Sequence, residues 1–424
     1  MKKDKKGKAI VIGQGYVGLL VAVAAAEVGW DVVGIDLDKT KVEMLQNGSS
    51  PVEDISDELL QKITEEGRYR ASSDYSDAVD FDVAVISVPT PLRETKPDLS
   101  YIELSGKDLA PFIKPGAIVI LESTTYPGTT EELLAPILEK GSGLKAGQDF
   151  YLGYSPERID PGNTNFGLKE TPKVVSGVNS QSLAKVKDFF DGFIVKTVPT
   201  TGTREAELAK LVENTFRHVN IALVNELAQF AGQLGIDIWE AIEAASSKPF
   251  GFMKFTPGPG VGGHCLPIDP SYLSWQVQTT LGMPFRFVDL ANDINNHMPD
   301  YVVQRVTDLL NADSKAVNGS KILMAGIAYK SNTGDVREAP ALKIIELLQS
   351  RGANVVAADP FVVDQNWPNG VEKLSFNKDA IDSADLVILI NQHDGFDLNL
   401  LEETATAVFD TRNVIKEGKT VTKL

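Results

Sequence analysis

Short apolar runs alternate with amphipathic stretches in the first half of the chain. Residues 8–12 form one mainly apolar run, an alanine-rich stretch follows to about residue 28, and residues 31–35 form the next run. Such runs are typical of parallel strands buried on both faces, and the stretches between them have the length of crossover helices. Further parallel strands are predicted at residues 82–88, 117–122, 150–154, 174–177 and 193–198. The pattern therefore indicates a doubly wound α/β unit.

The pattern changes near residue 203 to a helical period. Between residues 204 and 234, Thr215 and seven apolar side chains form one broad stripe, at Leu208, Leu211, Val212, Val219, Ala222, Leu223 and Leu227. A stripe of this length exceeds what one small domain covers, so we expect this helix to join two domains and to build a homodimer or a higher homo-oligomer. Shorter helices are predicted at residues 239–247, 270–281 and 285–313.

The end of the chain returns to the α/β pattern. Strands are predicted at residues 321–325, 354–358, 385–390 and 407–409, with a helix at 339–350. This second doubly wound unit lacks the three-glycine pattern, which fits a nucleotide ligand other than a dinucleotide. We therefore expect three domains, at residues 1–200, 201–313 and 314–424. Two Rossmann-like units would be joined by a long central helix and a helical middle segment.

The first strand leads into a glycine pattern that is typical of dinucleotide binding. Residues 13–18 read Gly13-Gln14-Gly15-Tyr16-Val17-Gly18, and Asp36 ends the next strand. Gly13 permits a tight turn, Gly15 lets backbone amides reach a pyrophosphate, and Gly18 lets helix and strand pack closely. Asp36 would accept from ribose hydroxyls and repel a 2′-phosphate, which favours NAD over NADP.

Three later strands end in polar turns. Pro89-Thr90-Pro91 follows the strand at 82–88, Ser123-Thr124-Thr125 follows 117–122, and Ser155-Pro156-Glu157-Arg158 follows 150–154. Ligands of open α/β sheets bind beyond the carboxyl ends of the strands, so we expect these turns to converge on the nicotinamide end of the cofactor. Ordinary turn chemistry is the alternative for each of them.

The single cysteine lies in a loop rich in glycine and proline. Residues 257–270 read Pro-Gly-Pro-Gly-Val-Gly-Gly-His-Cys-Leu-Pro-Ile-Asp-Pro and contain Cys265. Glycine lets backbone approach a ligand closely, so Cys265 is a candidate nucleophile, and an inert buried thiol is the alternative. Lys210 and Asn214 lie one turn apart on the long helix and can reach one substrate oxygen, although any long helix contains such pairs by chance.

Composition and charge narrow the class of protein. One cysteine excludes an internal disulfide framework and a cysteine-based zinc cluster, and the formal charge of -17 argues against a nucleic-acid surface. His218, His297 and His393 are scattered without metal-ligand spacing, so no metal is expected. No apolar run is long enough to span a bilayer, and the basic N-terminus has no signal-peptide core. We expect a cytoplasmic protein without a membrane partner.

With these motifs in place, the chain resembles the UDP-glucose/GDP-mannose dehydrogenase family over nearly its whole length. The Gly-Val-Gly-Gly-His-Cys loop and Ser155-Pro156-Glu157-Arg158-Ile159-Asp160-Pro161-Gly162 are similar to the branch acting on 2-acetamido sugars, UDP-N-acetylglucosamine above all. The resemblance implies a four-electron oxidation of the sugar C6 hydroxyl to a carboxylate with two NAD, in the synthesis of surface polysaccharide precursors. UDP-N-acetylmannosamine, UDP-N-acetylgalactosamine and UDP-glucose are the alternative substrates.

The resemblance also implies roles for single residues. Cys265 would hold the aldehyde as a thiohemiacetal and then form a thioester, with Lys210 and Asn214 stabilising the oxyanion. Asp269, Thr124 and Glu157 match the positions that place the hydrolytic water. The cofactor contacts would be Gly13, Gly15, Tyr16, Val17, Gly18, Asp36, Pro89, Thr90, Ser123, Thr124 and Arg337. The substrate contacts would be Glu157, Arg158, Lys210, Asn214, Lys254, Gly262 and Lys330, and His264 is a loop-packing residue or a contact.

Two other classes share part of these features. A two-electron 3-hydroxyacid dehydrogenase has the glycine fingerprint and a Lys-x-x-x-Asn helix, but has no use for Cys265 or a second doubly wound unit. An NAD sensor without catalysis would need neither Lys210 nor the cysteine loop. The number of NADH molecules formed per sugar separates these classes.

Overall fold

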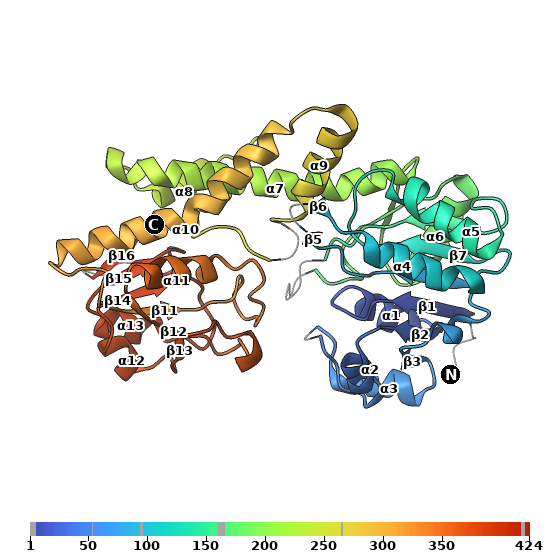
Figure 1. Cartoon of the computed structure of the whole chain (residues 1–424), viewed down its shortest axis with the longest axis horizontal. Coiled ribbons are helices and arrows are strands. Elements are labelled where there is room, and N and C mark those ends of the chain that lie inside the picture. Colours follow the sequence, from blue (N-terminus) through green and yellow to red (C-terminus); the bar gives the residue numbers. More distant parts are fainter. Residues whose placement is uncertain (1–5, 53, 94–95, 160–165, 264–265, 417–419) are drawn as a thin grey trace. The chain divides into compact units, whose positions relative to one another are not determined.

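The chain folds into two compact units, Met1–Glu213 and Asn214–Leu424, and each is described by itself (Figure 1). The computed structural model describes residues 6–52, 54–93, 96–159, 166–263, 266–416 and 420–424. The predicted class is confirmed, because each unit contains a six-stranded parallel sheet and a long helix runs through the middle of the sequence.

The N-terminal sheet has the strand order β3-β2-β1-β4-β7-β8. Its strands are β1 (Lys8–Ile12), β2 (Asp31–Ile35), β3 (Tyr69–Ser72), β4 (Val83–Ile86), β7 (Ile118–Leu121) and β8 (Tyr151–Tyr154). Its helices are α1 (Gly18–Glu27), α2 (Lys39–Gln46), α3 (Asp57–Glu65), α4 (Ser100–Leu109), α5 (Ala135–Ser142) and α6 (Ser180–Asp191). The direction of winding reverses between β1 and β4, where open α/β sheets bind ligands.

Two predictions for this unit need correction. β9 (Lys173–Val175) and β10 (Thr197–Pro199) pair only with each other, outside the six-stranded sheet. The strand predicted from residue 193 begins later because Phe193 belongs to a cluster of edge-on rings at the end of α6. β3 was not predicted, since its sequence Tyr-Arg-Ala-Ser is neither a continuous apolar run nor a clear alternation. β5 (Leu92–Arg93) and β6 (Lys96–Pro97) form a short antiparallel pair.

The predicted middle helices are confirmed to within three residues at their ends. They are α7 (Thr203–Ala231), α8 (Ile238–Ser246), α9 (Asp269–Leu281) and α10 (Arg286–Ala312). Asp237 caps the N-terminus of α8, and its carboxylate accepts from the amides of Trp239 and Glu240. Among the described residues, no helix is long and apolar enough to cross a membrane.

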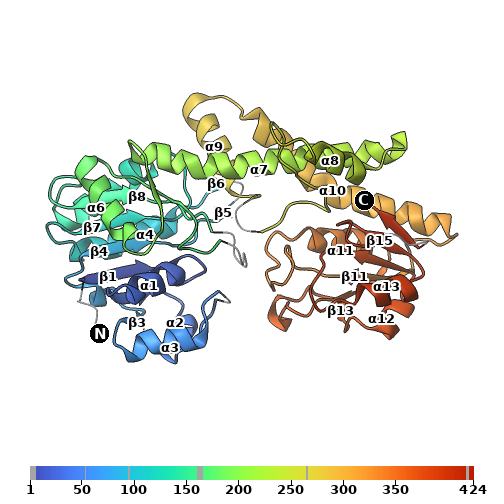
Figure 2. The same cartoon turned by 180° about the vertical axis from the view of Figure 1, so that it is seen from behind.

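The C-terminal sheet repeats the order of the first, as β13-β12-β11-β14-β15-β16 (Figure 1), and Figure 2 shows β13, β11 and β15 from behind. Its strands are β11 (Lys321–Ala325), β12 (Asn354–Ala358), β13 (Glu372–Lys373), β14 (Leu386–Leu389), β15 (Val408–Asp410) and β16 (Val421–Lys423). Its helices are α11 (Pro340–Ser350), α12 (Lys378–Asp382) and α13 (Leu398–Thr404).

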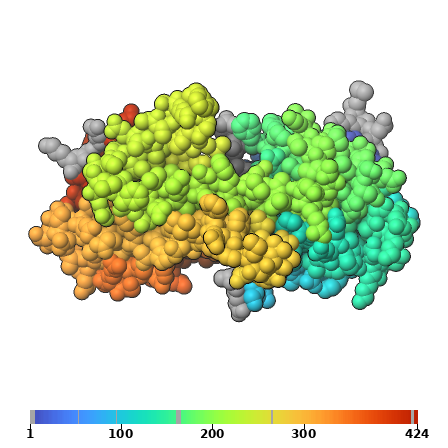
Figure 3. Space-filling model, turned by 90° about the horizontal axis from the view of Figure 1, so that it is seen from above, coloured from blue at the N-terminus to red at the C-terminus, as the bar shows by residue number. Residues whose placement is uncertain are grey.

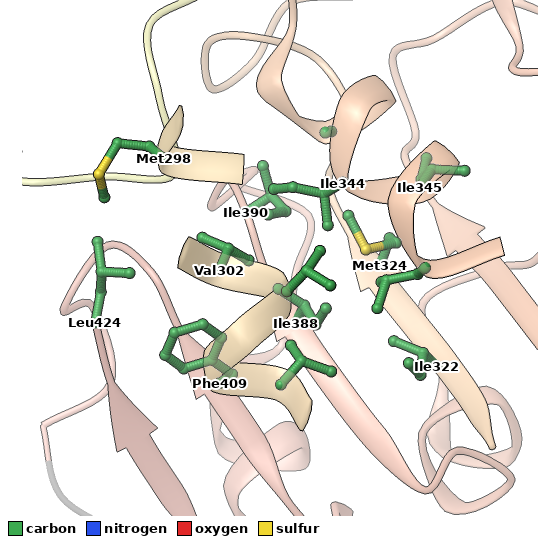
Figure 4. Close-up of a cluster of buried hydrophobic side chains, with 14 of the residues drawn as sticks. Met298, Val302, Ile322, Met324, Ile344, Ile345, Ile388, Ile390, Phe409 and Leu424 are labelled. Atoms are coloured by element: carbon green, nitrogen blue, oxygen red, sulfur yellow. The ribbon is translucent and has the colours of Figure 1, made fainter. Parts of the chain in front are cut away.

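Both faces of this second sheet are buried. Ile322 and Met324 point toward α10 and α11, where they meet Val302 and Ile344 (Figure 4). Leu323 and its alternate neighbours pack on the other face in a separate cluster with α12 and α13. Successive side chains of a strand point to opposite faces, so a strand covered on both sides must be apolar throughout.

Candidate functional site

The glycine fingerprint opens α1 in the expected way. Gly13 has φ +89°, and a Cβ there would lie 2.2 Å from the carbonyl oxygen of Ser87. A Cβ on Gly18 would lie 1.8 Å from the carbonyl oxygen of Gly13, so both glycines are required by the protein's own packing. A Cβ on Gly15 would meet no described atom within 4 Å. This open cradle beside the first turn of α1 fits a bound pyrophosphate.

Asp36 is held in place by three contacts at the end of β2. Its carboxylate accepts from the amides of Gln14 at 2.8 Å and Asp38 at 3.0 Å, and Lys41 Nζ lies 2.9 Å from Oδ2. The side chain keeps 11% of its surface exposed, so an oxygen remains within reach of a ribose hydroxyl. Lys41 was not predicted, and it places a cation beside the acid expected to exclude a 2′-phosphate.

The turns after β4 and β7 meet as expected. Ser123 Oγ accepts from the amide of Val88 at 2.9 Å and donates to its carbonyl oxygen at 2.8 Å. Thr90 is buried beside this junction, Thr124 is half-buried and Pro89 is exposed. Adjacent parallel strands thus bring together residues that lie 35 positions apart in the sequence.

Two predicted site residues are in contact: Glu157, in the turn after β8, and Lys210, on α7. Lys210 Nζ donates to the carbonyl oxygen of Glu157 at 2.5 Å. The Glu157 carboxylate accepts from the amides of Arg158 and Ile159, each at 2.6 Å. Burial alone would raise the pKa of Glu157, but the positive charges of Lys173 and Lys210 and the amide bonds lower it below its usual value. Glu157 is therefore ionised at neutral pH.

Behind this turn lies a buried cation that sequence reasoning missed. Lys173 Nζ lies 3.1 Å from a carboxylate oxygen of Glu157 and 2.5 Å from one of Glu122. Burial would lower the pKa of Lys173, yet the two carboxylates raise it above its usual value. Lys173 is 3% exposed, and no local motif distinguishes a lysine at the start of a short strand from a surface lysine.

Glu122 and Glu207 are two further buried carboxyl groups that the sequence did not reveal. Burial raises the pKa of Glu122 to about 7, although Lys173 acts against it. Burial likewise raises the pKa of Glu207 to about 7, against three hydrogen bonds that it accepts from Gly128 and Thr130. Glu207 lies one turn before Lys210 on α7, so these bonds fix the helix that carries Lys210.

In the C-terminal unit, Asn214 and Asp269 come together. Asn214 Nδ2 donates to Asp269 Oδ2 at 2.5 Å, and Asp269, 2% exposed, is the first residue of α9. His264 and Cys265 lie outside the described residues, as do Asp160, Pro161 and Gly162. The carboxylate of Asp269 thus lies four residues after Cys265 in the sequence, at the start of a helix that fixes its direction.

The backbone just before Cys265 packs on residues 326–338. The amide of Gly263 donates to the carbonyl oxygen of Arg337 at 3.0 Å. A Cβ on Gly263 would lie 2.7 Å from the ring of Tyr329, and one on Gly262 would lie 2.7 Å from the carbonyl oxygen of Glu338. These glycines are therefore needed for two loops to approach each other. The predicted contacts Gly262 and Arg337 lie at this junction, and the half-buried Lys330 follows Tyr329.

Three predicted or missed cations have defined partners. Arg158 makes two contacts with the Glu213 carboxylate, at 3.1 and 2.6 Å. Lys254 forms an exposed ion pair with Glu243, and within the described residues it makes no hydrogen bond or ion pair with another predicted site residue. Arg412, which was not predicted, donates to the carbonyl oxygen of Ile390 at 2.8 Å, and burial lowers its pKa to about 10.

Arg412 also faces the loop that leads to the cysteine. A Cβ on Gly258 would lie 2.7 Å from Arg412 Nη1. An arginine beside a glycine loop is a suitable partner for phosphate, because its planar fork donates to two oxygens at once. Within the described residues, no group of three or more His, Cys, Asp and Glu side chains is placed to hold a metal ion.

Models of three domains of one family match the chain. They are the NAD binding domain (residues 7–194), the central domain (204–297) and the UDP binding domain (323–417) of the UDP-glucose/GDP-mannose dehydrogenase family. The chain belongs to this family, and it is an NAD-dependent nucleotide-sugar dehydrogenase. The first unit accordingly contains the NAD binding domain, and the second doubly wound unit contains the UDP binding domain.

Individual relatives match over almost the whole chain. A UDP-N-acetyl-D-mannosamine dehydrogenase of Pyrococcus horikoshii is 34% identical over 413 residues, covering 96% of each chain. Protein CapL of Staphylococcus aureus is 35% identical over 422 residues, again covering 96% of each. The solved structure of UDP-D-ManNAc dehydrogenase from Pyrococcus horikoshii has a TM-score of 0.88, 32% identity and 98% coverage of both chains.

Proposed function

We propose that the protein oxidises the C6 hydroxyl of UDP-N-acetylmannosamine to a carboxylate. The observation that carries this choice is the full-length match to a dehydrogenase named for that sugar. The sequence motifs favoured UDP-N-acetylglucosamine as the substrate, with UDP-N-acetylmannosamine as an alternative. Both carry a 2-acetamido group, so the proposed change concerns only the configuration at C2.

The chemistry requires one site to hold an aldehyde between two oxidations. Gly13, Gly15 and Asp36 would hold NAD, which would supply the hydride acceptor for both oxidations. The Cys265 thiolate adds to the aldehyde carbon, the resulting thiohemiacetal loses the second hydride to become a thioester, and water then releases the carboxylate and the thiol. The role of Glu157 as a base is supported because its carboxylate is ionised and buried. The roles of Asp269 in placing water and of Asn214 in stabilising the oxyanion are supported because the two side chains are hydrogen-bonded to each other.

The number of NADH molecules formed per sugar consumed tests the covalent scheme. We expect two from the intact protein, whereas a two-electron dehydrogenase gives one and a sensor gives none. Cys265→Ser should lose the full reaction by several orders of magnitude and still bind NAD, because a serine hydroxyl is a far weaker nucleophile near neutral pH. Unchanged NADH formation by the serine variant would refute the covalent role.

A panel of UDP-sugars tests the choice of substrate. UDP-N-acetylmannosamine should show the highest kcat/KM, and UDP-glucose should be at least about tenfold poorer because the partners of the acetamido group would be left unpaired. The gluco and galacto 2-acetamido sugars are the main competitors. If UDP-glucose proves the best substrate, the assignment to acetamido sugars is wrong, although the two-step chemistry stands.

We also propose that two copies of the chain associate through the helices of the C-terminal unit. Large apolar side chains are exposed on α7 at Phe216, Leu223 and Phe230, and on α10 at Phe287 and Leu290. Figure 3 shows α10, in yellow and orange, at the surface of this view. Such a concentration of apolar surface is typical of an interface. Light scattering that shows a monomer at micromolar concentration would exclude this dimer.

A further inference from the structure

A buried histidine in the C-terminal unit, His393, takes no part in the chemistry described above. Its ring is fully buried, with the ring centroids of Phe361 and Phe396 each 5.1 Å away. It follows β14, the strand next to β11. His393 Nε2 lies 3.0 Å from Asp359 Oδ2, and His393 Nδ1 accepts from the amide of Asn332 at 3.0 Å. An acceptor at Nδ1 requires the proton on Nε2, so the ring is neutral and donates to Asp359.

Asp359 occupies the place in the second sheet that Asp36 occupies in the first. Each acid follows the strand next to the first strand of its sheet, and each Oδ2 accepts at 2.8 Å from the amide after the first glycine, Gln14 or Ile327. Asp359 also accepts from the amides of Ala328, Phe361 and Val362. With His393 as a fifth donor and a fully buried side chain, the Asp359 carboxylate has no oxygen left for a ligand.

His393 Nδ1 holds the middle of residues 326–338, which we call the UDP loop, through the amide of Asn332. Asn332 has φ +58°, a left-handed conformation that asparagine adopts more readily than most residues. The backbone amide of Asn332 donates to His393 Nδ1, and the side-chain oxygen of Asn332 accepts from the amide of Asp394 at 2.9 Å. The start of the loop is held by Asp359 through Ile327 and Ala328. One imidazole therefore connects the anchor at the start of the loop to the anchor at its middle.

The UDP loop carries two of the predicted ligand contacts, Lys330 and Arg337. Lys330 lies between the two anchors, and Arg337 follows them, paired with Asp335 at 2.6 Å. Tyr329 of the same loop packs on Gly263, two residues before Cys265. A shift of the loop would therefore move Lys330 and the support of the cysteine loop together.

We propose that His393 is a positioning residue for UDP: its neutral ring sets the conformation of residues 326–338 without touching the ligand. This inference rests on the family's UDP binding domain, and it does not depend on which sugar is oxidised. Nε2 stabilises the fold through Asp359, whereas Nδ1 orients the loop through Asn332. The two nitrogens thus have separable functions.

Two substitutions separate the two nitrogens. In His393→Asn the side-chain oxygen takes the place of Nδ1, so the bond to Asn332 is kept and the donor to Asp359 is lost. In His393→Gln the amide nitrogen takes the place of Nε2, so Asp359 keeps its donor and Asn332 loses its acceptor. The affinities for UDP and for NAD are measured by calorimetry on the full chain, and the unfolding midpoint is measured by calorimetric scanning.

We expect the two variants to show opposite defects. His393→Gln should weaken UDP binding about tenfold with little change in the midpoint, because Asn332 is exposed, so its amide can bond water once it loses Nδ1 and the loop can then shift. His393→Asn should lower the midpoint and keep UDP affinity within about threefold. NAD affinity should change much less than UDP affinity in both, because Arg337 is the one predicted cofactor contact that lies in the UDP loop. His297→Gln, an exposed histidine bonded only within its own helix among the described residues, is the matched control and should change nothing.

Two results would overturn the proposal. His393→Gln with wild-type affinity for UDP would show that the loop does not need the ring. Equal losses of UDP affinity and midpoint in both variants would show a general structural role instead of a positioning one. Because UDP itself is the probe, failure of the mannosamine assignment appears only in the sugar panel and leaves this test intact.

Discussion

The two sheets of this protein place an aspartate at equivalent positions and use it in different ways. Asp36 and Asp359 each follow the second strand in sequence of their sheet and accept from the amide after a glycine of positive φ. Asp36 pairs with Lys41 and keeps part of its carboxylate exposed, whereas Asp359 is enclosed by five donors, one of them His393. The same backbone geometry thus leaves a partly exposed carboxylate in one unit and forms an internal anchor in the other.

The loops that follow the first strand of each sheet also differ in how open they are to a ligand. Gly13 and Gly326 have φ +89° and +81°, so both sheets need the same tight turn after their first strand. Two residues later stand Gly15, with open space beside it, and Ala328, which is fully buried. The first loop therefore leaves room for a pyrophosphate over its backbone, and the second fills that place with a side chain.

The largest expected effect is a difference in stability between variants that lack one aspartate or the other. Asp359→Ala leaves several buried amides and His393 without an acceptor, so we expect a loss of about 3–5 kcal/mol in the free energy of unfolding. Asp36→Ala removes a partly exposed carboxylate and should cost about 1 kcal/mol or less. Urea titration of the two variants measures this difference. Similar losses would mean that the two acids are structurally equivalent after all.

The next test concerns the glycine loop of the first unit. Gly15→Ala should weaken NAD binding by about tenfold or more, because the new methyl group occupies the space where backbone meets pyrophosphate, and the fold should be unaffected. Gly18→Ala should instead destabilise the N-terminal unit, since its Cβ would lie 1.8 Å from a carbonyl oxygen. NAD affinity and the unfolding midpoint are measured for both. If Gly15→Ala binds NAD normally, the cradle is not the pyrophosphate site.

Sequence patterns predicted the parts of the site that depend on local spacing. The fingerprint at residues 13–18, the acid at position 36 and the polar turns after β4, β7 and β8 all have neighbours within one supersecondary unit. The contacts of Lys173 with Glu122 and of His393 with Asp359 join residues 51 and 34 positions apart, and they depend on strand order. No pattern around a single lysine or histidine indicates such a partner, so these networks became visible only in the folded chain.

Cofactor choice tests whether Asp36 is open to ligand. Asp36→Ala should narrow the preference for NAD over NADP by on the order of 1–3 kcal/mol, because repulsion of the 2′-phosphate disappears and Lys41 is released to bind it. The ratio of kcat/KM for the two cofactors measures the change. The double variant Asp36→Ala with Lys41→Ala is the control and should regain less NADP activity. An unchanged ratio in Asp36→Ala would place the ribose elsewhere.

The smallest expected effect is a pH dependence that differs in sign between two buried acids. Burial raises the pKa of Glu122 from 4.5 to about 7, since Lys173 offers it only partial compensation, whereas the donors around Asp359 lower its pKa despite burial. A raised pKa stabilises the folded state most below pH 4.5, and this contribution is lost as the pH rises through about 7. A lowered pKa stabilises the folded state above the usual pKa of aspartate, and this contribution is lost in acid.

Amide substitutions should reveal this difference directly. Relative to the wild type, Glu122→Gln should gain on the order of 1 kcal/mol of stability between pH 5 and pH 8, because the glutamine carries no charge to bury. Asp359→Asn should be least stable relative to the wild type at pH 8, and its deficit should shrink toward pH 3. Unfolding by urea at several pH values measures both differences. A Glu122→Gln variant whose stability relative to the wild type does not change with pH would show that Glu122 remains ionised beside Lys173.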